Sequence, residues 1–350
     1  MIFEICDLIF LKNMQNKKQI KVAINGFGRI GRTVFKHILK NPKLKVAVIN
    51  DLTDNATLAH LLKYDSVYGR FNAKINSDAE NLYVGKQNFP VFEESDPTKL
   101  PWKKLNVDVV LECTGIFRQQ SDCIKHIRAG AKKVIISAPA KDNDVPTYLI
   151  GVNEDKYKGE QIISMASCTT NCIAPVTRVL QENFGIKRAF LTTVHSYTAD
   201  QNIVDGPHKD LRRARAAAQN IVPTTTGAAI AMTKIYPELN GKFDGIAVRV
   251  PTVCGSLSDL VFELEKKTDI KKINEAFKKA ASNKKLKNIL KATDELIVST
   301  DILGDEHSSI VDLSCTQILA GNFVKIIAWY DNEWAYSKRL EEMIEIVMGK

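Results

Sequence analysis

The sequence contains only seven cysteines among its 350 residues, and they do not repeat a C-x-x-C spacing. A secreted disulfide framework pairs its cysteines, and a zinc ribbon needs two C-x-x-C pairs, so this odd set disfavours both classes. The sequence also has no apolar run near the roughly 20 residues that a membrane-spanning helix requires. We therefore expect a cytoplasmic protein with no metal site and no membrane partner.

The first 19 residues, MIFEICDLIFLKNMQNKKQ, open with an apolar stretch that Glu4 and Asp7 interrupt. A signal peptide carries positive charge before its apolar segment and a small-residue cleavage site after it, whereas here Lys12 follows the stretch and no such site is present. We predict that residues 1–19 form a loosely ordered extension. Two alternatives stay open: an upstream start codon, with Met14 as the true first residue, and a membrane-surface tag.

The bulk composition is that of an ordinary globular chain with an excess of positive charge. Hydrophobic residues make up 45% of the sequence, which allows a sizeable core and, at this length, two domains. The formal charge of +9 favours anionic partners, namely nucleic acids, acidic membranes or phosphorylated metabolites, without choosing among them. Lysines crowd only in residues 271–288, which we interpret as a solvated helix face, with a nucleic-acid patch as the alternative.

In the first half of the chain, short and continuously apolar segments alternate with helical ones. The strand-like segments are IKVAIN, KVAVIND, VDVVLECTG and KKVIISAP. Continuous apolar strands are typical of a parallel sheet that is covered on both faces. We predict an α/β fold with a doubly wound parallel sheet over residues 20–167.

After about residue 167 the strands become longer and more alternating, as in AFLTTVHSY and SLSDLVFELEKK. Such alternation suits a largely antiparallel sheet with one covered face. We predict an α+β second domain over residues 168–332. The amphipathic C-terminal helix, residues 333–350, is expected to pack back on the first domain and complete it.

Gly26, Gly28 and Gly31 form G-x-G-x-x-G between the predicted first strand and a helix. These glycines allow a tight turn, close approach to a pyrophosphate and close helix packing, and the helix N-terminus offers free N–H groups. Asp51 ends the next strand about 20 residues later, where it would accept hydrogen bonds from a ribose 2′-hydroxyl and repel a 2′-phosphate. The segment predicts a Rossmann-type dinucleotide site that favours NAD over NADP.

Two cysteines, Cys168 and Cys172, lie four residues apart in SMASCTTNCIAP. The compartment disfavours a disulfide, and further metal ligands are not nearby in sequence. We interpret the pair as one nucleophile and one structural thiol. Ser167 is a good N-cap, so a helix that begins at Cys168 would lower the pKa of that thiol. A structural role for Cys168 remains the alternative at this point.

A cysteine nucleophile needs a base, and His195 lies at the end of a predicted strand in the polar run TTVHSYTAD. A structural histidine is the alternative. The segments VPTTTGAA and VRVPT add hydroxyls, a glycine N–H and Arg249, all of which can hold phosphate oxygens. Threonine clusters are also ordinary strand residues.

Together these segments resemble the glyceraldehyde-3-phosphate dehydrogenase family. The matching runs, in order, are NGFGRIGR, VINDL, ASCTTNCIAP, TVHSYTADQ, DLRRARAAA, PTTTGAA, RVPT and WYDNEW, over about residues 20–350. The resemblance implies phosphorylating oxidation of glyceraldehyde 3-phosphate to 1,3-bisphosphoglycerate with NAD, a step of glycolysis and gluconeogenesis. It implies that Cys168 carries a thiohemiacetal and then a thioester, and that His195 is the base.

The resemblance also implies an NAD-binding domain over residues 20–167, a catalytic domain over residues 168–332 and three sets of site residues. Those matching the substrate-phosphate site are Thr198, Asp200 and Arg249. Those matching the inorganic-phosphate site are Ser167, Thr169, Thr226 and Gly227. Those matching cofactor contacts are Gly26, Gly28, Arg29, Ile30, Gly31, Asp51, Ser137 and, at the nicotinamide carboxamide, Asn332. Segment 198–220 resembles a loop beside a neighbouring subunit's cofactor, which implies a homotetramer.

Several positions depart from the family pattern. Met165 stands where the family usually has Asn, which could alter the backbone support beneath the nucleophile, and Ser95 replaces an Arg near the adenine. RVPTVCG replaces the common RVPTPN. Gly206 replaces a Leu close to the adenosine ribose, which leaves room for a 2′-phosphate, so use of NADP beside NAD stays open. Asp51 and Leu52 still argue for NAD.

Two competing functions remain. Erythrose-4-phosphate dehydrogenase shares the cysteine motif, and LPWKKLNVDVVLECTG and the non-proline residue after RVPT favour it, whereas Thr198 and the PTTTG run argue against it. The positive charge motivates a second alternative, a nucleotide-fold protein that binds RNA or a receptor. The cysteine, histidine and anion-binding groups would then have no use, so we do not expect nucleic acid as the primary partner.

Overall fold

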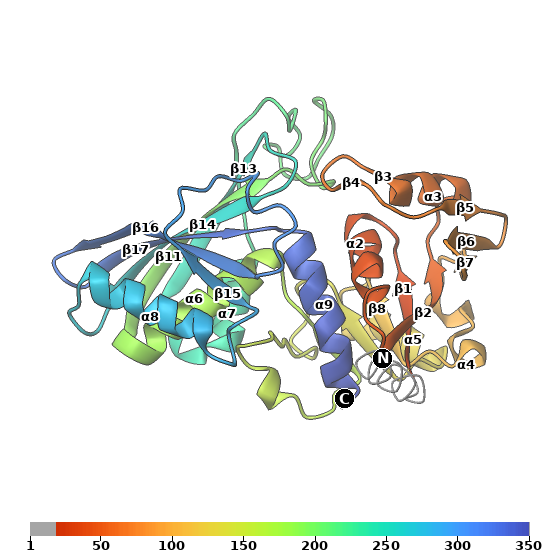
Figure 1. The fold of residues 1–350 in the computed structure, drawn as a ribbon, viewed down its shortest axis with the longest axis horizontal. Helices are drawn as coiled ribbons and strands as arrows, with labels where there is room; N and C mark the ends of the chain where they lie inside the picture. Colours follow the sequence, from red (N-terminus) through yellow and green to blue (C-terminus); the bar gives the residue numbers. More distant parts are fainter. Residues whose placement is uncertain (1–18, 350) are drawn as a thin grey trace, which may run out of the picture.

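A computed structural model of the protein describes residues 19–349. In this part of the chain the main strands form an eight-stranded sheet and a seven-stranded sheet (Figure 1). Residues 1–18, which carry nearly all of the predicted N-terminal extension, lie outside the described residues. Among the described residues, no helix combines the length and the apolar character needed to cross a bilayer.

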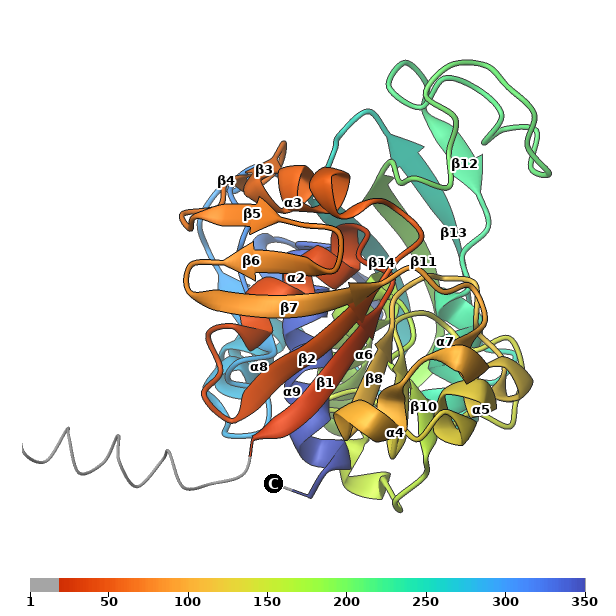
Figure 2. The same cartoon turned by 90° about the vertical axis from the view of Figure 1, so that its right-hand side faces the viewer.

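The first sheet has the strand order β10-β9-β8-β1-β2-β7-β6-β5, seen in Figure 2. Its parallel strands are β1 (Ile20–Asn25), β2 (Leu44–Asn50), β7 (Gln87–Phe92), β8 (Val109–Glu112), β9 (Lys133–Ile136) and β10 (Ile162–Ser164). The antiparallel strands β5 (Ile75–Ser77) and β6 (Asn81–Val84) extend the edge beyond β7. Because chain order reverses beside β1, the carboxyl ends of β1 and β8 form the switch point where such sheets bind ligands.

Helices cover both faces of this sheet. On one face are α2 (Arg29–Ile38) and α3 (Asn55–Lys63), and on the other are α4 (Trp102–Leu105) and α5 (Gln120–Arg128). Cover on both faces explains why β8 is buried at every residue and why its sequence is continuously apolar up to its last residue. A short ribbon joins β3 (Tyr64–Asp65) to β4 (Gly69–Arg70).

The second sheet has the order β12-β13-β11-β14-β17-β16-β15. Its strands are β11 (Ile186–Ser196), β12 (Val222–Thr224), β13 (Phe243–Val250), β14 (Ser256–Leu264), β15 (Leu290–Thr293), β16 (Ser309–Leu319) and β17 (Phe323–Tyr330). All its pairs are antiparallel except β11–β13 and β15–β16. The predicted fold class, a Rossmann-type sheet with a largely antiparallel second sheet, is confirmed.

Helices cover one face of the second sheet, and strand burial alternates accordingly. The covering helices are α6 (Cys168–Phe184), α7 (Ala228–Ile235) and α8 (Ile270–Ser282) (Figure 1). Along β14 every second residue is buried. The remaining short helical turns are Pro97–Lys99, Glu154–Lys156 and Pro237–Leu239.

The last helix, α9 (Trp334–Val347), lies between the two sheets in Figure 1. Its side chains Tyr336, Leu340 and Ile344 belong to the same buried core as β1 and α2, although α9 follows directly on the second sheet. Residues 331–333 therefore sit at the junction of the two sheets. The N-terminus of α6 reaches the same junction, because the Tyr336 hydroxyl donates to the Ala166 carbonyl at 2.9 Å.

Candidate active site

Cys168 is the first residue of α6, and the local chain holds it there. The Ser167 hydroxyl caps the helix by accepting from the Thr170 N–H at 3.1 Å. Ala166 adopts the left-handed backbone, with φ of 53°, which turns the chain sharply into the helix. The Asn171 amide then donates to the carbonyls of residues 165 and 167, at 2.9 and 3.0 Å. The position of Cys168 is thus fixed by the left-handed turn at Ala166, by the Ser167 cap and by Asn171.

Met165, one of the departures from the family pattern, faces away from this turn. Its side chain is fully buried in the core of the first sheet. Its N–H donates to the Ile136 carbonyl at 3.1 Å, and its own carbonyl accepts from Asn171. The support beneath Cys168 therefore comes from backbone and from Asn171, and the Met165 side chain contributes packing.

His195 lies near the end of β11, with its Nε2 atom 3.4 Å from the Cys168 sulfur. Its Nδ1 atom is 2.7 Å from the Ser196 carbonyl and 2.6 Å from Nη1 of Arg249. A guanidinium only donates, so these two contacts correspond to different tautomers. When Nδ1–H donates to Ser196, Nε2 is a free acceptor that faces the thiol.

Burial controls the protonation of both groups. It lowers the pKa of His195 to about 3, aided by the charge of Arg249 and opposed by the Ser196 carbonyl. Burial also raises the pKa of Cys168, although Arg249 and the Thr169 N–H both lower it. The prediction that the helix terminus lowers this pKa is right for that contribution but wrong for the net shift, because burial outweighs it. Both shifts favour a thiol and a neutral imidazole over the ion pair.

A buried tyrosine links the nucleophile's helix to the histidine's strand. The Tyr330 hydroxyl lies 2.9 Å from the Thr169 hydroxyl and 2.8 Å from that of Thr193. Its ring meets the His195 ring edge to face, with 5.9 Å between centroids. Thr169 is thereby engaged with Tyr330 and is 4% exposed, so its hydroxyl does not face an open anion site here.

Arg249 is the cation nearest the reacting pair. It stands opposite His195 in the parallel pairing of β11 with β13, and its Nε atom is buried without a hydrogen-bond partner among the described residues. An unpaired guanidinium N–H beside the thiol is suited to an anionic ligand. Thr198 follows β11 in a half-buried position, and Asp200 is exposed and ion-paired with Arg213 rather than with Arg249.

Arg213 also holds the two residues just before Thr226 and Gly227, which were predicted to bind inorganic phosphate. Its Nε atom donates to the Thr224 hydroxyl at 2.9 Å and its Nη2 atom to the Thr225 carbonyl at 3.3 Å. Directly after this segment, the Thr226 hydroxyl accepts from the Ala228 N–H at 3.2 Å, and Gly227 caps α7. Arg213 therefore links Asp200, of the predicted substrate-phosphate set, to the residues that precede Thr226.

The glycine turn lines a cavity of about 460 Å³ at the switch point of the first sheet. A Cβ on Gly26, whose φ is +93°, would meet the Thr114 backbone at 2.7 Å, and one on Gly31 would meet the Gly26 carbonyl at 2.1 Å. A Cβ on Gly28 would meet nothing within 4 Å. The outer glycines thus permit packing of the turn, whereas Gly28 leaves open space before the helix N-terminus. This is the shape that a pyrophosphate needs.

Asp51 directly follows β2 and lies beside the same cavity. Its carboxylate accepts from the Phe27 N–H at 2.6 Å and from the Thr53 N–H at 3.0 Å. Ser137 follows β9, with its N–H donating to the Glu112 carbonyl at 3.0 Å. Both predicted cofactor residues therefore lie at carboxyl ends of the parallel strands, as the fold requires.

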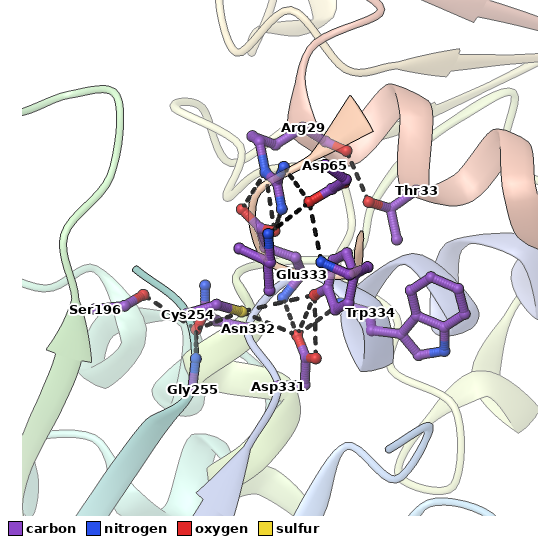
Figure 3. Close-up of polar contacts among 12 residues, drawn as sticks. Arg29, Thr33, Asp65, Ser196, Cys254, Gly255, Asp331, Asn332, Glu333 and Trp334 are labelled. Atoms are coloured by element: carbon purple, nitrogen blue, oxygen red, sulfur yellow. Dashed lines mark hydrogen bonds and ion pairs between the residues drawn. The ribbon is translucent and has the colours of Figure 1, made fainter. Parts of the chain in front are cut away.

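Figure 3 shows how Arg29, at the start of α2, is tied to residues far along the chain. Its guanidinium pairs with Asp65 at 2.9 Å and with Glu333 through both Nε and Nη2. Burial lowers the pKa of Arg29, but the two carboxylates outweigh it and hold the pKa above its ordinary value. The side chain of Arg29 thus joins the start of α2 to the residue just before α9.

Asn332 projects from the same junction, and its orientation is determined by its neighbours (Figure 3). Its Oδ1 atom accepts from the Gly255 N–H at 3.1 Å, from the Ser256 hydroxyl at 2.9 Å and from the Ser196 hydroxyl at 3.1 Å. A backbone N–H only donates, so the atom facing it is the amide oxygen. Nδ2 makes no hydrogen bond within residues 19–349 and is left as a donor. Cys254, from the unusual VCG run, lies 3.7 Å from the same oxygen.

Comparisons with known proteins agree with this geometry. The model of the glyceraldehyde 3-phosphate dehydrogenase NAD binding domain matches residues 20–120, and that of the C-terminal domain matches residues 167–332. The chain is 53% identical to the glyceraldehyde-3-phosphate dehydrogenases of Streptomyces coelicolor and Geobacillus stearothermophilus, over 94% and 95% of its length and 98% and 99% of theirs. The chain belongs to the glyceraldehyde-3-phosphate dehydrogenase family. Glyceraldehyde-3-phosphate dehydrogenase 1 of Bacillus subtilis is 52% identical to the chain, over 95% of the chain and 99% of its own length.

Membership of the glyceraldehyde-3-phosphate dehydrogenase family confirms the predicted resemblance, the predicted NAD-dependent oxidoreductase class and the NAD cofactor. The individual site residues stay predictions that the geometry supports. In the described part of the chain, no three His, Cys, Asp or Glu side chains group so as to hold a metal ion. The six described cysteines are all free, and Cys172 is buried against the Ala328 carbonyl and the Ser309 hydroxyl, at 3.8 Å each.

The sequence reasoning missed three residues that organise this family's site here. Tyr330 and Glu333 belong to the WYDNEW run, and Arg213 belongs to DLRRARAAA, so each lies in a run that had been noticed. Arg213 has one local partner, Asp210, but its contacts with Asp200 and Thr224 span more than ten residues, and the cited contacts of Tyr330 and Glu333 span more than a hundred. The sequence runs WYDNEW and DLRRARAAA were therefore the only available signal, because local residue spacing does not predict contacts between distant segments.

Proposed function

We propose that the protein catalyses the phosphorylating oxidation of glyceraldehyde 3-phosphate to 1,3-bisphosphoglycerate with NAD. The observation that carries this proposal is the 3.4 Å contact between the Cys168 sulfur and Nε2 of His195, with Arg249 beside them. A thiol facing a neutral imidazole can attack an aldehyde and surrender its proton in the same event. The names of the relatives supply the substrate, because each is a glyceraldehyde-3-phosphate dehydrogenase.

The proposed reaction begins when the Cys168 sulfur attacks the aldehyde carbon. Its proton passes to Nε2 of His195, a carbon–sulfur bond forms, and the carbonyl oxygen gains the electron pair of the broken π bond. The imidazolium of His195 then gives this oxygen a proton, which completes the thiohemiacetal. When the carbon is oxidised, His195 takes the same proton back. NAD, when bound, supplies the acceptor for the hydride that the carbon then loses. The product of this stage is a thioester on Cys168.

In the second stage, an oxygen of inorganic phosphate attacks the thioester carbon. The carbon–sulfur bond breaks, and Cys168 leaves as a thiolate beside the charge of Arg249, which favours the charged sulfur. The product is the acyl phosphate 1,3-bisphosphoglycerate. Two phosphate groups must be held during this stage, which is why two anion sites are needed around one sulfur.

For the anion sites, we propose the assignments that the family pattern implies. Thr198, Asp200 and Arg249 would hold the substrate's own phosphate, and the buried, unpaired Nε of Arg249 supports this. The residues proposed for inorganic phosphate are Ser167, Thr169, Thr226 and Gly227. Asp200 and Thr169 would have to exchange their present partners, Arg213 and Tyr330, to take part.

For the cofactor, the glycine turn would hold the pyrophosphate, Asp51 the adenosine ribose and Asn332 the nicotinamide carboxamide. The open space at Gly28 and the free Nδ2 of Asn332 support these roles. Arg29 and Ile30 would contribute backbone N–H groups at the start of α2. Ser137 would contact the cofactor from the end of β9.

We further propose a cytoplasmic homotetramer, with an NAD-binding domain over residues 20–167, a catalytic domain over residues 168–332 and a completing helix over residues 333–350. Exposed apolar side chains on the uncovered face of the second sheet support assembly, among them Phe190 and Ile246. Monomeric proteins rarely leave such a face to water.

A steady-state assay tests the proposal with two aldehydes and two cofactors. We expect phosphate-dependent NADH formation with glyceraldehyde 3-phosphate and a far lower kcat/KM with erythrose 4-phosphate. We expect NAD to be preferred over NADP because Asp51 would lie beside the adenosine ribose. Gly206 leaves room for a 2′-phosphate, so the ratio of kcat/KM for the two cofactors is the quantity to measure. A higher kcat/KM with erythrose 4-phosphate would contradict the proposed substrate.

A further inference from the structure

The buried carboxylate of Glu112 lies at the carboxyl end of β8, and the proposed chemistry does not use it. Glu112 is 1% exposed. One oxygen accepts from the N–H of Thr114 at 2.8 Å and from its hydroxyl, and the other accepts from Nδ2 of Asn25 at 2.6 Å and from Nε2 of His126 at 3.2 Å. An ionised carboxylate offers about four acceptor positions and no donor, so four donors fill it completely.

The partner of His126 determines which way its hydrogen bond runs. The indole Nε1–H of Trp102 lies 3.0 Å from Nδ1 of His126, and an indole nitrogen can only donate. Nδ1 is therefore the acceptor, and the proton of the neutral imidazole is on Nε2, facing Glu112. Both Trp102 and His126 are fully buried.

The amides on the other side are ordered in the same sense. Since Asn25 donates Nδ2 to Glu112, its Oδ1 atom faces Nδ2 of Asn50, 2.7 Å away. Oδ1 of Asn50 in turn accepts from the Glu94 N–H at 3.0 Å, and its Nδ2 also donates to the Glu94 carbonyl at 2.9 Å. The linking hydrogen bonds from both sides thus point toward Glu112, an arrangement in which each bond polarises the next.

This chain of side chains follows the carboxyl edge of the first sheet. Asn25, Asn50 and Glu112 are the last residues of β1, β2 and β8, which are neighbours in the sheet (Figure 2). Asn25, Asn50 and Thr114 line the cavity at the glycine turn. Gly26 rests on the Thr114 backbone, because a Cβ there would lie 2.7 Å from the Thr114 nitrogen. The carboxylate therefore holds the surface on which the turn packs.

We propose that Glu112 is a positioning residue for the dinucleotide. By gathering donors from β1, from the loop after β8 and from α5, it fixes the glycine turn and the strand ends in the shape that receives the pyrophosphate and the adenosine ribose. The inference rests on the proposed function, in which NAD occupies this cavity. Because Glu112 acts through Thr114 and Asn25, its effect falls on cofactor affinity and not on the steps at Cys168.

The variant Glu112→Gln tests this because it keeps the side chain's size and replaces one acceptor oxygen by an NH₂ donor. Whichever way the amide turns, its NH₂ faces either the Thr114 N–H or the donors of Asn25 and His126. A buried donor then loses its acceptor, the shaped turn becomes less populated, and apparent affinity falls with that population. We expect the Kd of NAD to rise by about tenfold, with kcat at saturating NAD changed by less than about twofold.

The comparison ligand is ADP-ribose, which lacks the nicotinamide. We expect calorimetry to show its Kd rising by the same factor as that of NAD, because Glu112 supports the pyrophosphate and adenosine end. The matched control is Glu341→Gln, which alters another carboxylate with 1% exposure, on α9, bonded to Lys338 at 2.7 Å and to Asn41. This control should lower Tm and leave both Kd values unchanged.

If Glu112→Gln lowers Tm and leaves both Kd values at wild type, the residue only supports the fold and the inference is overturned. Should Glu112→Gln fail to fold, Trp102→Phe tests the same series of hydrogen bonds from its other end. This variant removes the indole N–H that keeps the proton of His126 on Nε2, facing Glu112. We expect a smaller, parallel rise of both Kd values there, and unchanged values would again overturn the inference. Failure of the wild-type protein to bind NAD would instead contradict the proposed function.

Discussion

At the scale of single residues, burial favours the uncharged forms of Cys168 and His195 before substrate arrives. Burial raises the pKa of Cys168 and lowers that of His195 to about 3, so a preformed thiolate and imidazolium pair is disfavoured. The thiol proton therefore moves as the sulfur attacks. Arg249 lowers the pKa of both groups, which favours the thiolate and keeps the imidazole free to accept.

The variant His195→Asn removes the proton acceptor while leaving a polar side chain in its place. We expect the rate of acylation to fall by roughly 10²- to 10⁴-fold, the range typical of a general base. Stopped-flow NADH formation measures this rate, and calorimetry should show an unchanged Kd for NAD. An acylation rate equal to wild type would mean that another group takes the thiol proton.

The site residues that could be predicted from the sequence are those whose neighbours in sequence form a recognisable local motif. The glycine triplet, Cys168 after Ser167, and His195 in a polar strand end each have a local signature. Tyr330 has none, because its two threonine partners lie on elements far from it in sequence. The net pKa shift of Cys168 was misjudged for the same reason, since burial depends on the whole fold.

At the scale of elements, the three glycines of the turn before α2 have separable roles. Added Cβ atoms on Gly26 and Gly31 would meet backbone at 2.7 and 2.1 Å, whereas one on Gly28 meets nothing. We expect Gly28→Ala to keep the wild-type Tm and to weaken NAD binding, because the methyl group occupies the space for the pyrophosphate. Gly31→Ala, its matched partner, should lower Tm even without cofactor.

Thermal unfolding and NAD titration of Gly28→Ala and Gly31→Ala test whether the two glycines have these separate roles. A lowered Tm in Gly28→Ala without cofactor would show that this glycine is needed for the fold itself. Wild-type NAD affinity in Gly28→Ala would show that the pyrophosphate does not pass over this position.

The type of each sheet could be predicted from the sequence, but not every pairing within it. Continuous apolar runs such as VDVVLE predicted parallel strands, and the alternation of SLSDLVFEL predicted a strand with one covered face. The parallel pairs β11–β13 and β15–β16 had no such signal. Strands β11 and β13 are separated by the segment that holds β12 and α7, and β15 and β16 are separated by residues 294–308, which contain no helix.

At the scale of the whole molecule, the uncovered face of the second sheet exposes apolar side chains. Phe190 and Ile246, on the adjacent strands β11 and β13, are 67% and 50% exposed. Further exposed apolar residues lie between β11 and β12 and on α7, namely Ile203, Val204, Leu211, Ile221 and Ile230. Burying such side chains against a second copy of the chain is favourable.

Light scattering after size exclusion tests this assembly. We expect the wild-type protein to have the mass of four chains, and the double variant Phe190→Asp with Ile246→Asp to form smaller species. The control Leu296→Asp alters a side chain that is still more exposed, at 88%, on the loop after β15, and it should keep the wild-type mass. A monomeric wild-type protein would contradict the proposed tetramer.

Two buried histidines make the folded chain sensitive to acid. Burial lowers the pKa of both His37 and His195 to about 3, and in the unfolded chain a histidine titrates near 6.5. Between these values the unfolded chain binds more protons, so the free energy of unfolding falls on acidification. The loss is up to about 1.4 kcal/mol per pH unit for each histidine, begins near pH 6.5 and is complete near pH 3.

Urea unfolding at two pH values, above 6.5 and near 5, measures this loss at fixed protein concentration. In His37→Gln, we expect the histidine contribution to the difference between the two pH values to shrink by about half, because one of two titrating groups is gone. An undiminished difference would mean that His37 titrates normally in the folded protein.

In the proposed reaction, Cys168 carries the acyl group between the two stages. Without inorganic phosphate, wild-type protein mixed with glyceraldehyde 3-phosphate and NAD should release about one NADH per chain in a burst, and mass spectrometry should place the acyl group on Cys168. Adding phosphate should then restore turnover, and Cys168→Ala should bind NAD yet give no burst. Phosphate-dependent turnover by Cys168→Ala would contradict the account.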